Sequence, residues 1–311
     1  MDRRAIGSLW VSVVGLGCNN FGIRLDEAGT GRVVHAALDA GINFFDTADI
    51  YGGGGRSEEF LGRALGARRS DVLIATKFGM PMDDQHRGAR PEYVRAAVED
   101  SLRRLGTDHI DLYQLHQPDP SVPIAETLGA MNELVVAGKV REIGCSNFSA
   151  QQIREAEDVS TGRGFARFVS VQNEYSLLRR DPEIDVLAEC ERVNAAFLPF
   201  FPLASGLLTG KYHRGESAPE GSRLASGPRA AQLTDDRLAQ VELLRDFAHS
   251  TGHTLLELAF AWLLAKPVVA SVIAGATKPE QVASNVATTE WRLTDDEMAA
   301  INRILPAPTK A

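Results

Sequence analysis

Three successive apolar runs of this chain each end on an ionisable side chain, first Asp46, then Lys77, then His116. Tyr51, a possible proton donor, follows Asp46 by five residues. In a barrel of parallel strands the loops that follow the strands converge at one edge, which is where active sites lie. The order of these residues therefore predicts that an acid, a phenol, an amine and an imidazole meet at one site.

The four side chains suit proton transfer to an oxygen. A phenol with a pKa near 10 is a poor acid at neutral pH, and a nearby ammonium such as that of Lys77 would lower the pKa of Tyr51. Asp46 could pair with Lys77, because a buried lysine without a partner is unfavourable. His116 could donate a hydrogen bond to a substrate oxygen or share its proton with the phenol. The set predicts an acid site aimed at a carbonyl group, with no metal ion.

Strand-like and helix-like segments alternate along the chain and would position these residues. The amino-terminal stretch from Leu9 to Val14 predicts a hairpin on the barrel floor that leads into a first strand through Gly15-Leu-Gly17. The later expected strands are Ile42 to Asp46, Val72 to Thr76, Ile110 to His116, Val140 to Cys145, Phe168 to Val171, Ala195 to Phe200 and Ala270 to Ala274. The expected helices are Glu27 to Ala40, Ser57 to Leu65 with Ser57 as N-cap, Pro91 to Leu105, the segment around Leu128 to Val135, Ala150 to Asp158, Pro182 to Arg192, Asp235 to Ser250, Thr254 to Ala265, Pro279 to Val286 and Thr294 to Leu305. We therefore expect a (β/α)8 barrel with an amino-terminal hairpin and extra carboxyl-terminal helices, as one domain over residues 1–311.

The segment from Leu203 to Leu233 interrupts the alternation and is rich in Gly, Ser, Pro and Arg, which is typical of a functional or disordered loop. The runner-up fold is a doubly wound open sheet, which would bind a nucleotide through G-x-G-x-x-G. That fingerprint fails here, because Gly15-Leu-Gly17 is followed at the third position by Asn20. The glycine run Gly52 to Gly55 is better explained as a flexible turn.

Composition narrows the classes of partner. The 311 residues are 44% hydrophobic and 24% charged, and the net charge of −8 disfavours a nucleic-acid or anionic-membrane surface. We expect a small-molecule partner, no nucleic acid and no membrane, and the oligomeric state stays open. The sequence has no bilayer-spanning run, its start lacks the core of a signal peptide, and its three cysteines form no C-x-x-C, so a cytoplasmic location is expected.

Several motifs, taken in order along the chain, resemble those of the aldo-keto reductases. They are Gly41-Ile-Asn-Phe-Phe-Asp-Thr-Ala48, Tyr51-Gly52, Thr76-Lys77-Phe78, Leu112 to His116, Gly144 to Phe148, Val171 to Tyr175, Pro202 to Tyr212 and Pro279 to Val282. The resemblance covers essentially the whole chain. It implies a (β/α)8 barrel that transfers hydride from a nicotinamide cofactor, NADP(H), to an aldehyde or ketone. Tyr51 would be the general acid, Lys77 with Asp46 would tune it, and His116 would orient the carbonyl.

The same resemblance implies a cofactor site. Ser146, Asn147 and Gln172 would bind the nicotinamide carboxamide, and Phe200 would stack on the ring. The other implied contacts are Gly17, Cys18, Asn19, Asp46, Tyr51, Phe201, Pro202, Leu203 and Gly206, with Lys211 and Arg223 at the pyrophosphate and Gly275, Thr277, Lys278, Gln281 and Asn285 at the adenosine half. A cation such as Lys278 beside a ribose phosphate favours NADP over NAD.

Some positions depart from the family pattern, and other functions stay open. Phe200 stands where Tyr or Trp is common, Phe201 where Ser is common, and the glycine run changes the spacing from Tyr51 to Glu58. The substrate pocket is expected near Phe21, residues 80–91 and the 203–233 segment. The alternative is a nucleotide-binding sensory or assembly subunit of the same fold, as in channel beta subunits. A cofactor-free lyase or isomerase would leave the predicted carboxamide site unexplained.

Overall fold

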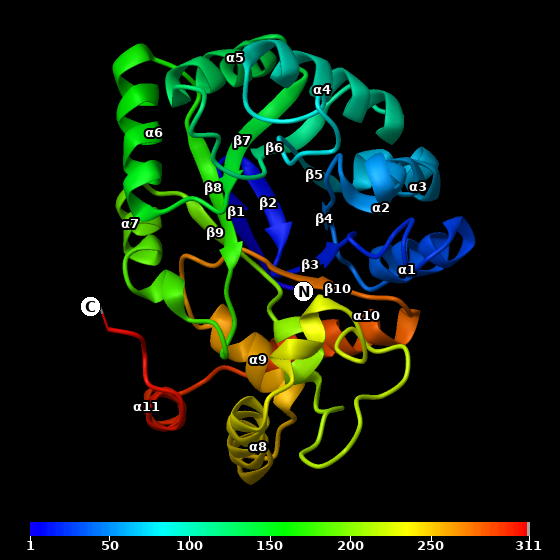
Figure 1. Ribbon diagram of the computed structural model, residues 1–311, viewed down its shortest axis with the longest axis vertical. Helices are drawn as coiled ribbons and strands as arrows, with labels where there is room; N and C mark the ends of the chain where they lie inside the picture. Colours follow the sequence, from blue (N-terminus) through cyan, green and yellow to red (C-terminus); the bar gives the residue numbers. More distant parts are fainter. Residues whose placement is uncertain (310–311) are drawn as a thin grey trace.

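Eight parallel strands form a nearly closed barrel in the computed structural model, which describes residues 1–309 (Figure 1). The strands are β3 (Val14–Gly17), β4 (Phe44–Asp46), β5 (Leu73–Phe78), β6 (Ile110–Leu115), β7 (Val140–Ser146), β8 (Phe168–Glu174), β9 (Ala196–Phe200) and β10 (Val272–Gly275). Each of β3 to β8 pairs with the next strand along the chain, and β10 pairs with β3. The ring is completed between β9 and the chain just before β10, where the Ala270 amide donates to the Phe197 carbonyl oxygen at 3.1 Å. The predicted barrel is thus confirmed, and the doubly wound sheet is wrong.

Helices surround the barrel on its outer side (Figure 1). They are α1 (Glu27–Asp39), α2 (Tyr51–Gly54), α3 (Arg56–Leu65), α4 (Pro91–Leu105), α5 (Ile124–Val136), α6 (Ala150–Arg163), α7 (Val186–Arg192), α8 (Asp235–Ser250), α9 (Leu255–Leu264), α10 (Pro279–Ala287) and α11 (Asp295–Ile304). Local sequence explains several of their ends. Pro91 occupies the first turn of α4 and Gly106 ends it in the left-handed conformation, while Ser149, Thr254 and Thr294 begin α6, α9 and α11 with capping boxes.

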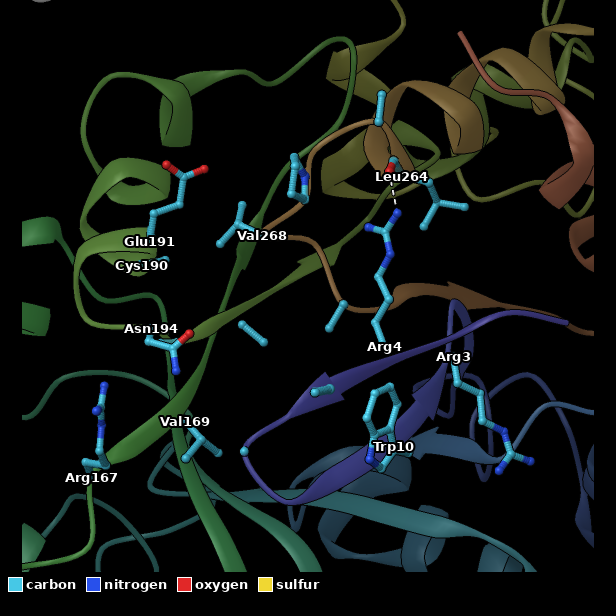
Figure 2. A pocket seen from close by; sticks show the side chains of 17 residues that line it. Arg3, Arg4, Trp10, Arg167, Val169, Cys190, Glu191, Asn194, Leu264 and Val268 are labelled. Carbon is cyan, nitrogen blue, oxygen red and sulfur yellow. Dashed lines mark hydrogen bonds between the residues drawn. The ribbon is translucent and has the colours of Figure 1, made fainter.

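The amino-terminal hairpin of β1 (Arg3–Ile6) and β2 (Leu9–Ser12) packs against one end of the barrel, as predicted. Ile6, Leu9 and Val11 are buried in a cluster with barrel residues that include Phe44. The Arg4 guanidinium donates hydrogen bonds to the carbonyl oxygens of residue 264, the last of α9, and of residues 266 and 269 just beyond it. Figure 2 shows one of these bonds beside a cavity of about 880 Å³ that the hairpin borders. Arg4 therefore ties the first strand to the last quarter of the chain.

The beginning of α3 differs from the prediction. Ser57 is not the N-cap, because α3 begins at Arg56 after Gly55, which has a φ of 98°. The Ser57 hydroxyl is buried, donates to the Cys18 carbonyl oxygen at 2.8 Å and lies 2.8 Å from the Thr47 hydroxyl. The side chain therefore joins α3 to the loops after β3 and β4 instead of capping its own helix.

Three other segments also differ in detail. The predicted helix from Pro182 to Arg192 is a 3-10 turn, η2 (Asp181–Glu183), followed by α7, and the predicted helix from Ala150 extends to Arg163. The segment 203–233 contains two 3-10 turns, η3 (Ala204–Thr209) and η4 (Pro228–Gln232). The predicted single domain covers residues 1–311, of which 310 and 311 lie outside the described part.

Candidate active site

The structure brings the four predicted catalytic side chains together at the carboxyl ends of β4, β5 and β6. The ammonium of the fully buried Lys77 donates to Asp46 Oδ2 at 2.6 Å and to the Thr47 carbonyl oxygen at 2.9 Å. The same ammonium lies 5.3 Å from the centre of the Tyr51 ring. The rings of Tyr51 and His116 meet edge to face, with their centres 5.7 Å apart. A buried ion pair thus lies beside a phenol and an imidazole.

The second oxygen of Asp46 is also satisfied. Asp46 Oδ1 accepts hydrogen bonds from the side-chain amides of Gln172 at 2.9 Å and Gln114 at 3.3 Å. A buried ion pair is favourable only when its remaining polar atoms are bonded, and this carboxylate meets that condition. In the Lys77 ammonium, burial acts to lower the pKa. The attraction and hydrogen bond of Asp46, together with the effect of Tyr51, outweigh burial and raise the pKa, so Lys77 stays charged.

The pKa of Tyr51 moves in the opposite direction to the prediction. Desolvation by the surrounding protein raises the Tyr51 pKa above its ordinary value, and the Lys77 ammonium opposes that rise without reversing it. The expectation of a net lowering is therefore wrong. The Tyr51 ring is still partly exposed to the groove. Tyr51 is thus a protonated phenol at neutral pH, which has a proton to give to a group that enters the groove.

His116 is held in its neutral form. Burial, with a smaller contribution from the Lys77 charge, lowers the pKa of His116 well below its ordinary value. Its Nδ1 atom is buried and has no hydrogen-bond partner within residues 1–309. A buried N–H without an acceptor is costly, so we assign the imidazole proton to Nε2. His116 can then donate one hydrogen bond without adding a charge to the site.

A groove of about 680 Å³ opens in front of these residues. Its lining contains Tyr51, His116 and nearly all the predicted cofactor contacts. Those contacts are Gly17, Cys18, Asn19, Asp46, Tyr51, Ser146, Asn147, Gln172, Phe200, Phe201, Pro202, Leu203, Gly206, Lys211, Arg223, Gly275, Thr277, Gln281 and Asn285. Lys77 lies buried behind the lining. The exception is Lys278, which lies exposed at the N-cap of α10 and does not line the groove.

The lining also includes residues that the sequence did not single out. They are Asn20, Arg24, Ser205, Thr209, Arg229, Leu256, Ile273, Ala274 and Ser284. Met80, which also lines the groove, was expected near the substrate pocket, whereas Phe21 is fully buried in the core and does not line the groove. The arginine content of the 203–233 segment was a signal for Arg229. The sequence contains no such signal for Leu256 and Ile273. An apolar residue of a helix or strand has the same place in the sequence pattern whether it faces a groove or the core.

Backbone strain is concentrated along the groove. Asn147, Phe201 and Ser205 line it with φ values of 62°, 50° and 59°, in the left-handed region that non-glycine residues rarely adopt. The Asn147 side-chain amide donates to the His116 carbonyl oxygen at 2.9 Å, which holds this turn against the end of β6. Such strain is retained where the surrounding structure fixes it, and it is most frequent at functional sites.

The charge of the groove suits an anionic ligand. Its acidic lining residue, Asp46, is paired with Lys77, whereas Arg24, Lys211, Arg223 and Arg229 are cationic. The Arg223 guanidinium donates to Asn20 Oδ1 at 2.8 Å, across the groove from the long segment to the loop after β3. Burial first, and then repulsion by Arg229 and Arg24, lowers the pKa of Arg223. The arginines of the groove thus lie close enough to repel one another.

The groove therefore fits a nicotinamide dinucleotide in its chemistry. The lining offers side-chain amides and the Phe200 ring to a nicotinamide, and its arginines offer partners for phosphate groups. The thiol of Cys18 is buried and its pKa is raised well above normal by that burial, so it is a neutral wall residue and not a nucleophile. Among the described residues, no group of three or more His, Cys, Asp or Glu side chains could hold a metal ion.

Comparisons with known proteins agree with this geometry. The profile of the Aldo/keto reductase family matches residues 13–306. The uncharacterized oxidoreductase YrpG of Bacillus subtilis is 36% identical over 96% of this chain and 94% of its own, and a probable voltage-gated potassium channel subunit beta of rice (Oryza sativa subsp. japonica) is 37% identical over 86% and 83%. The holo form of the aldo-keto reductase AKR11C1 from Bacillus halodurans superposes with a TM-score of 0.83 at 35% identity, over 100% of this chain and 98% of that one. Within residues 1–309, no helix is long and apolar enough to cross a membrane.

Proposed function

Because the chain belongs to the aldo-keto reductase family, we propose that it is an oxidoreductase that reduces an aldehyde or ketone to an alcohol with NADPH. The observation that best supports this proposal is the complete set of Lys77, Asp46, Tyr51 and His116 at the wall of a cationic groove. We also propose that the protein acts in the cytoplasm on a small-molecule carbonyl compound, as a single barrel domain.

In the proposed reaction, the carbonyl carbon would accept a hydride, which is the chemistry that NADPH would supply when bound. Tyr51 gives its hydroxyl proton to the carbonyl oxygen, and Lys77 stabilises the phenolate that results. His116 donates an Nε2–H hydrogen bond to the same oxygen and orients it toward the phenol. Negative charge develops on that oxygen in the transition state, so donors fixed in advance around it lower the barrier. Solvent restores the proton to Tyr51 before the next turnover.

The cofactor would be held by the residues that line the groove. Ser146, Asn147 and Gln172 offer polar groups to a carboxamide, and Phe200 offers a ring face. Lys211 and Arg223 would bind the anionic phosphates. The density of cations supports NADPH, which carries one phosphate more than NADH, and Arg24 and Arg229 add to that charge. We propose that Lys278 contacts the cofactor from outside the groove, because its side chain is exposed and does not line the groove.

A second candidate is a nucleotide-binding assembly or sensory subunit with little turnover. The similarity to probable potassium channel beta subunits of rice and Arabidopsis thaliana, at 37% and 36% identity, favours it. A binding subunit would need the cofactor groove but not the proton donor. The intact phenol, with its paired lysine, therefore favours the enzyme.

The test is NADPH oxidation, with NADH alongside, across aromatic aldehydes, aliphatic aldehydes, diketones and sugars. Tyr51→Phe should bind NADPH like the parent and lose about 10²-fold or more of its turnover, because only the proton is removed. Tyr175→Phe is the matched control, since it deletes a hydroxyl that donates to Glu183 outside the groove, and its turnover should be unchanged. Parent-level turnover by Tyr51→Phe would refute the mechanism. NADPH binding without oxidation by any carbonyl compound would favour the assembly subunit.

A further inference from the structure

The turn that presents Tyr51 has an unusual build. The four residues after Tyr51 are glycines, and all four have positive φ values, between 79° and 98°. Glycine contributes no side chain to hold a turn and loses more conformational freedom than any other residue when it is ordered. The position of the phenol must therefore be fixed mainly from the other side, by residues 47–50.

Two backbone hydrogen bonds attach residues 47–50 to β5. The Thr47 amide donates to the Ala75 carbonyl oxygen at 2.8 Å, and the Asp49 amide donates to the Lys77 carbonyl oxygen at 3.0 Å. The side chain of Asp49 extends the attachment outward to α4, where the Tyr93 hydroxyl donates to Asp49 Oδ2 at 3.3 Å. Asp49 thus connects the turn of the proton donor to both the lysine strand and the neighbouring helix.

The Asp49 carboxyl is an unusual group to find in this place. It is 1% exposed, and its Oδ1 atom has no hydrogen-bond partner within residues 1–309. The proposed reaction assigns it no role. A buried carboxylate normally has a paired cation or several donors. Asp49 has the Tyr93 hydroxyl and the Ile50 backbone amide, and the Arg104 guanidinium that attracts it is hydrogen-bonded to Glu58. The neutral acid would cost far less to bury than the anion.

The charged and titratable groups around Asp49 show why no cation forms an ion pair with it. From α3, Glu58 is fully buried, and its carboxylate already occupies the Arg104 guanidinium of α4 at 2.6 Å and accepts from the Thr76 hydroxyl at 2.5 Å. Two phenols also lie near Asp49, those of Tyr93 of α4 and Tyr113 of β6. The pKa of each is raised, so both are uncharged at neutral pH. A negative charge on Asp49 would therefore lie near Glu58, with Arg104 already taken.

We propose that Asp49 is a positioning residue for Tyr51, and that its neutral carboxyl, held by the Tyr93 hydroxyl, keeps the turn with the phenol in its working place. The inference rests on the proposed carbonyl reduction for its effect on turnover, but not for its effect on the turn. Burial first, and repulsion by Glu58 second, raises the pKa of Asp49 to about 7. The group therefore changes charge near neutrality. The Tyr93 hydrogen bond by itself favours the ionised carboxylate, but a buried negative charge beside Glu58 is costly, so the ionised side chain would move toward solvent and loosen the turn.

No catalytic group competes for that titration. The pKa values of Tyr51, Lys77 and Cys18 are raised and that of His116 is lowered well below its ordinary value, so none of them moves toward 7. The nearby imidazole is that of His86, an exposed loop residue whose ring centre lies 6.3 Å from that of Tyr93. His86→Gln therefore serves as a matched control, because it changes a neighbour of Tyr93 and leaves Asp49 intact.

The experiment measures two properties of the full chain from about pH 6 to 8.5. One is kcat for a carbonyl substrate. The other is hydrogen exchange of the peptide that spans residues 47–55, corrected for the intrinsic effect of pH on exchange. In the parent, kcat should fall with an inflection near the Asp49 pKa, by up to about thirtyfold if the ionised form is inactive, and exchange of this peptide should accelerate over the same range. NADPH binding should change little.

Asp49→Asn should keep the low-pH kcat and lose both pH effects, because an amide cannot ionise. His86→Gln should keep both effects. Tyr93→Phe should move the inflection to higher pH, because the hydroxyl that favours the ionised carboxylate is removed. An unchanged inflection in Asp49→Asn would overturn the inference, and if that variant does not fold, an unshifted inflection in Tyr93→Phe would overturn it. If no carbonyl compound is reduced, the proposed function fails, and the exchange measurement alone decides the role of Asp49.

Discussion

Removing one partner of the buried pair between Lys77 and Asp46 should destabilise the protein strongly, and the two removals should differ. In Lys77→Met, the Asp46 carboxylate keeps its hydrogen bonds from Gln114 and Gln172, so the loss should lie near the lower end of the 3–5 kcal/mol range, at about 3 kcal/mol. In Asp46→Asn, the fully buried Lys77 ammonium keeps one carbonyl partner that is not a charge, and the loss should approach about 5 kcal/mol. The asymmetry follows from the unequal number of remaining partners.

The measurement is the midpoint of thermal unfolding for both single variants and the double variant. For a chain of 311 residues, about 1 kcal/mol corresponds to roughly 1.5 °C, so the expected losses are about 5 °C for Lys77→Met and about 7 °C for Asp46→Asn. The double variant should be more stable than the sum of the single losses predicts, because it leaves no unpaired buried charge. Purely additive losses would show that Lys77 and Asp46 are not energetically coupled, which would contradict a stabilising buried ion pair at this site.

Four further substitutions test other parts of the structure. Asp49→Asn should flatten the pH dependence of the unfolding free energy, because a carboxyl with its pKa raised to about 7 stabilises the fold fully below its unfolded pKa and loses that contribution, about 4 kcal/mol, as the pH rises to about 7. Gly62→Ala should lose about 1–3 kcal/mol, since its Cβ would collide with the backbone of α4, while Gly162→Ala, with no atom within 4 Å of the new Cβ, should gain about 0.5–1 kcal/mol. Arg180→Met should expose the last helix to proteolysis before the barrel, because the buried Arg180 guanidinium donates to the carbonyl oxygen of the residue after α11.

The sequence predicted the barrel because its signals were local and repeated. Apolar runs alternated with helical spacing, and the ends of α4 and α8 agree with the predicted bounds, where Pro91 and Thr234 supply the initiating chemistry. The meeting of Asp46, Lys77 and His116 was predictable for the same reason, since parallel strands place their carboxyl ends together.

What the sequence could not supply depends on contacts between distant segments. Ser57 has the residue type of an N-cap, yet it bonds to the loops after β3 and β4, and those partners are set only by the closed barrel. Lys278 matches a motif, but residue types do not show that its side chain is exposed at the N-cap of α10, outside the groove lining. The sign of the Tyr51 pKa shift needed the depth of burial, which residue types do not reveal.

The two proton-bearing rings of the site illustrate how burial and one charge can cooperate. Burial favours the neutral form of every ionisable group, so it raises the pKa of the Tyr51 phenol and lowers that of the His116 imidazole. The Lys77 charge adds to the second shift and only moderates the first. Both rings therefore remain neutral donors at neutral pH, and the buried pair beside them carries no net charge. An oxygen that gains negative charge in this site meets two hydrogen-bond donors and a fixed ammonium, without an unpaired anion to repel it.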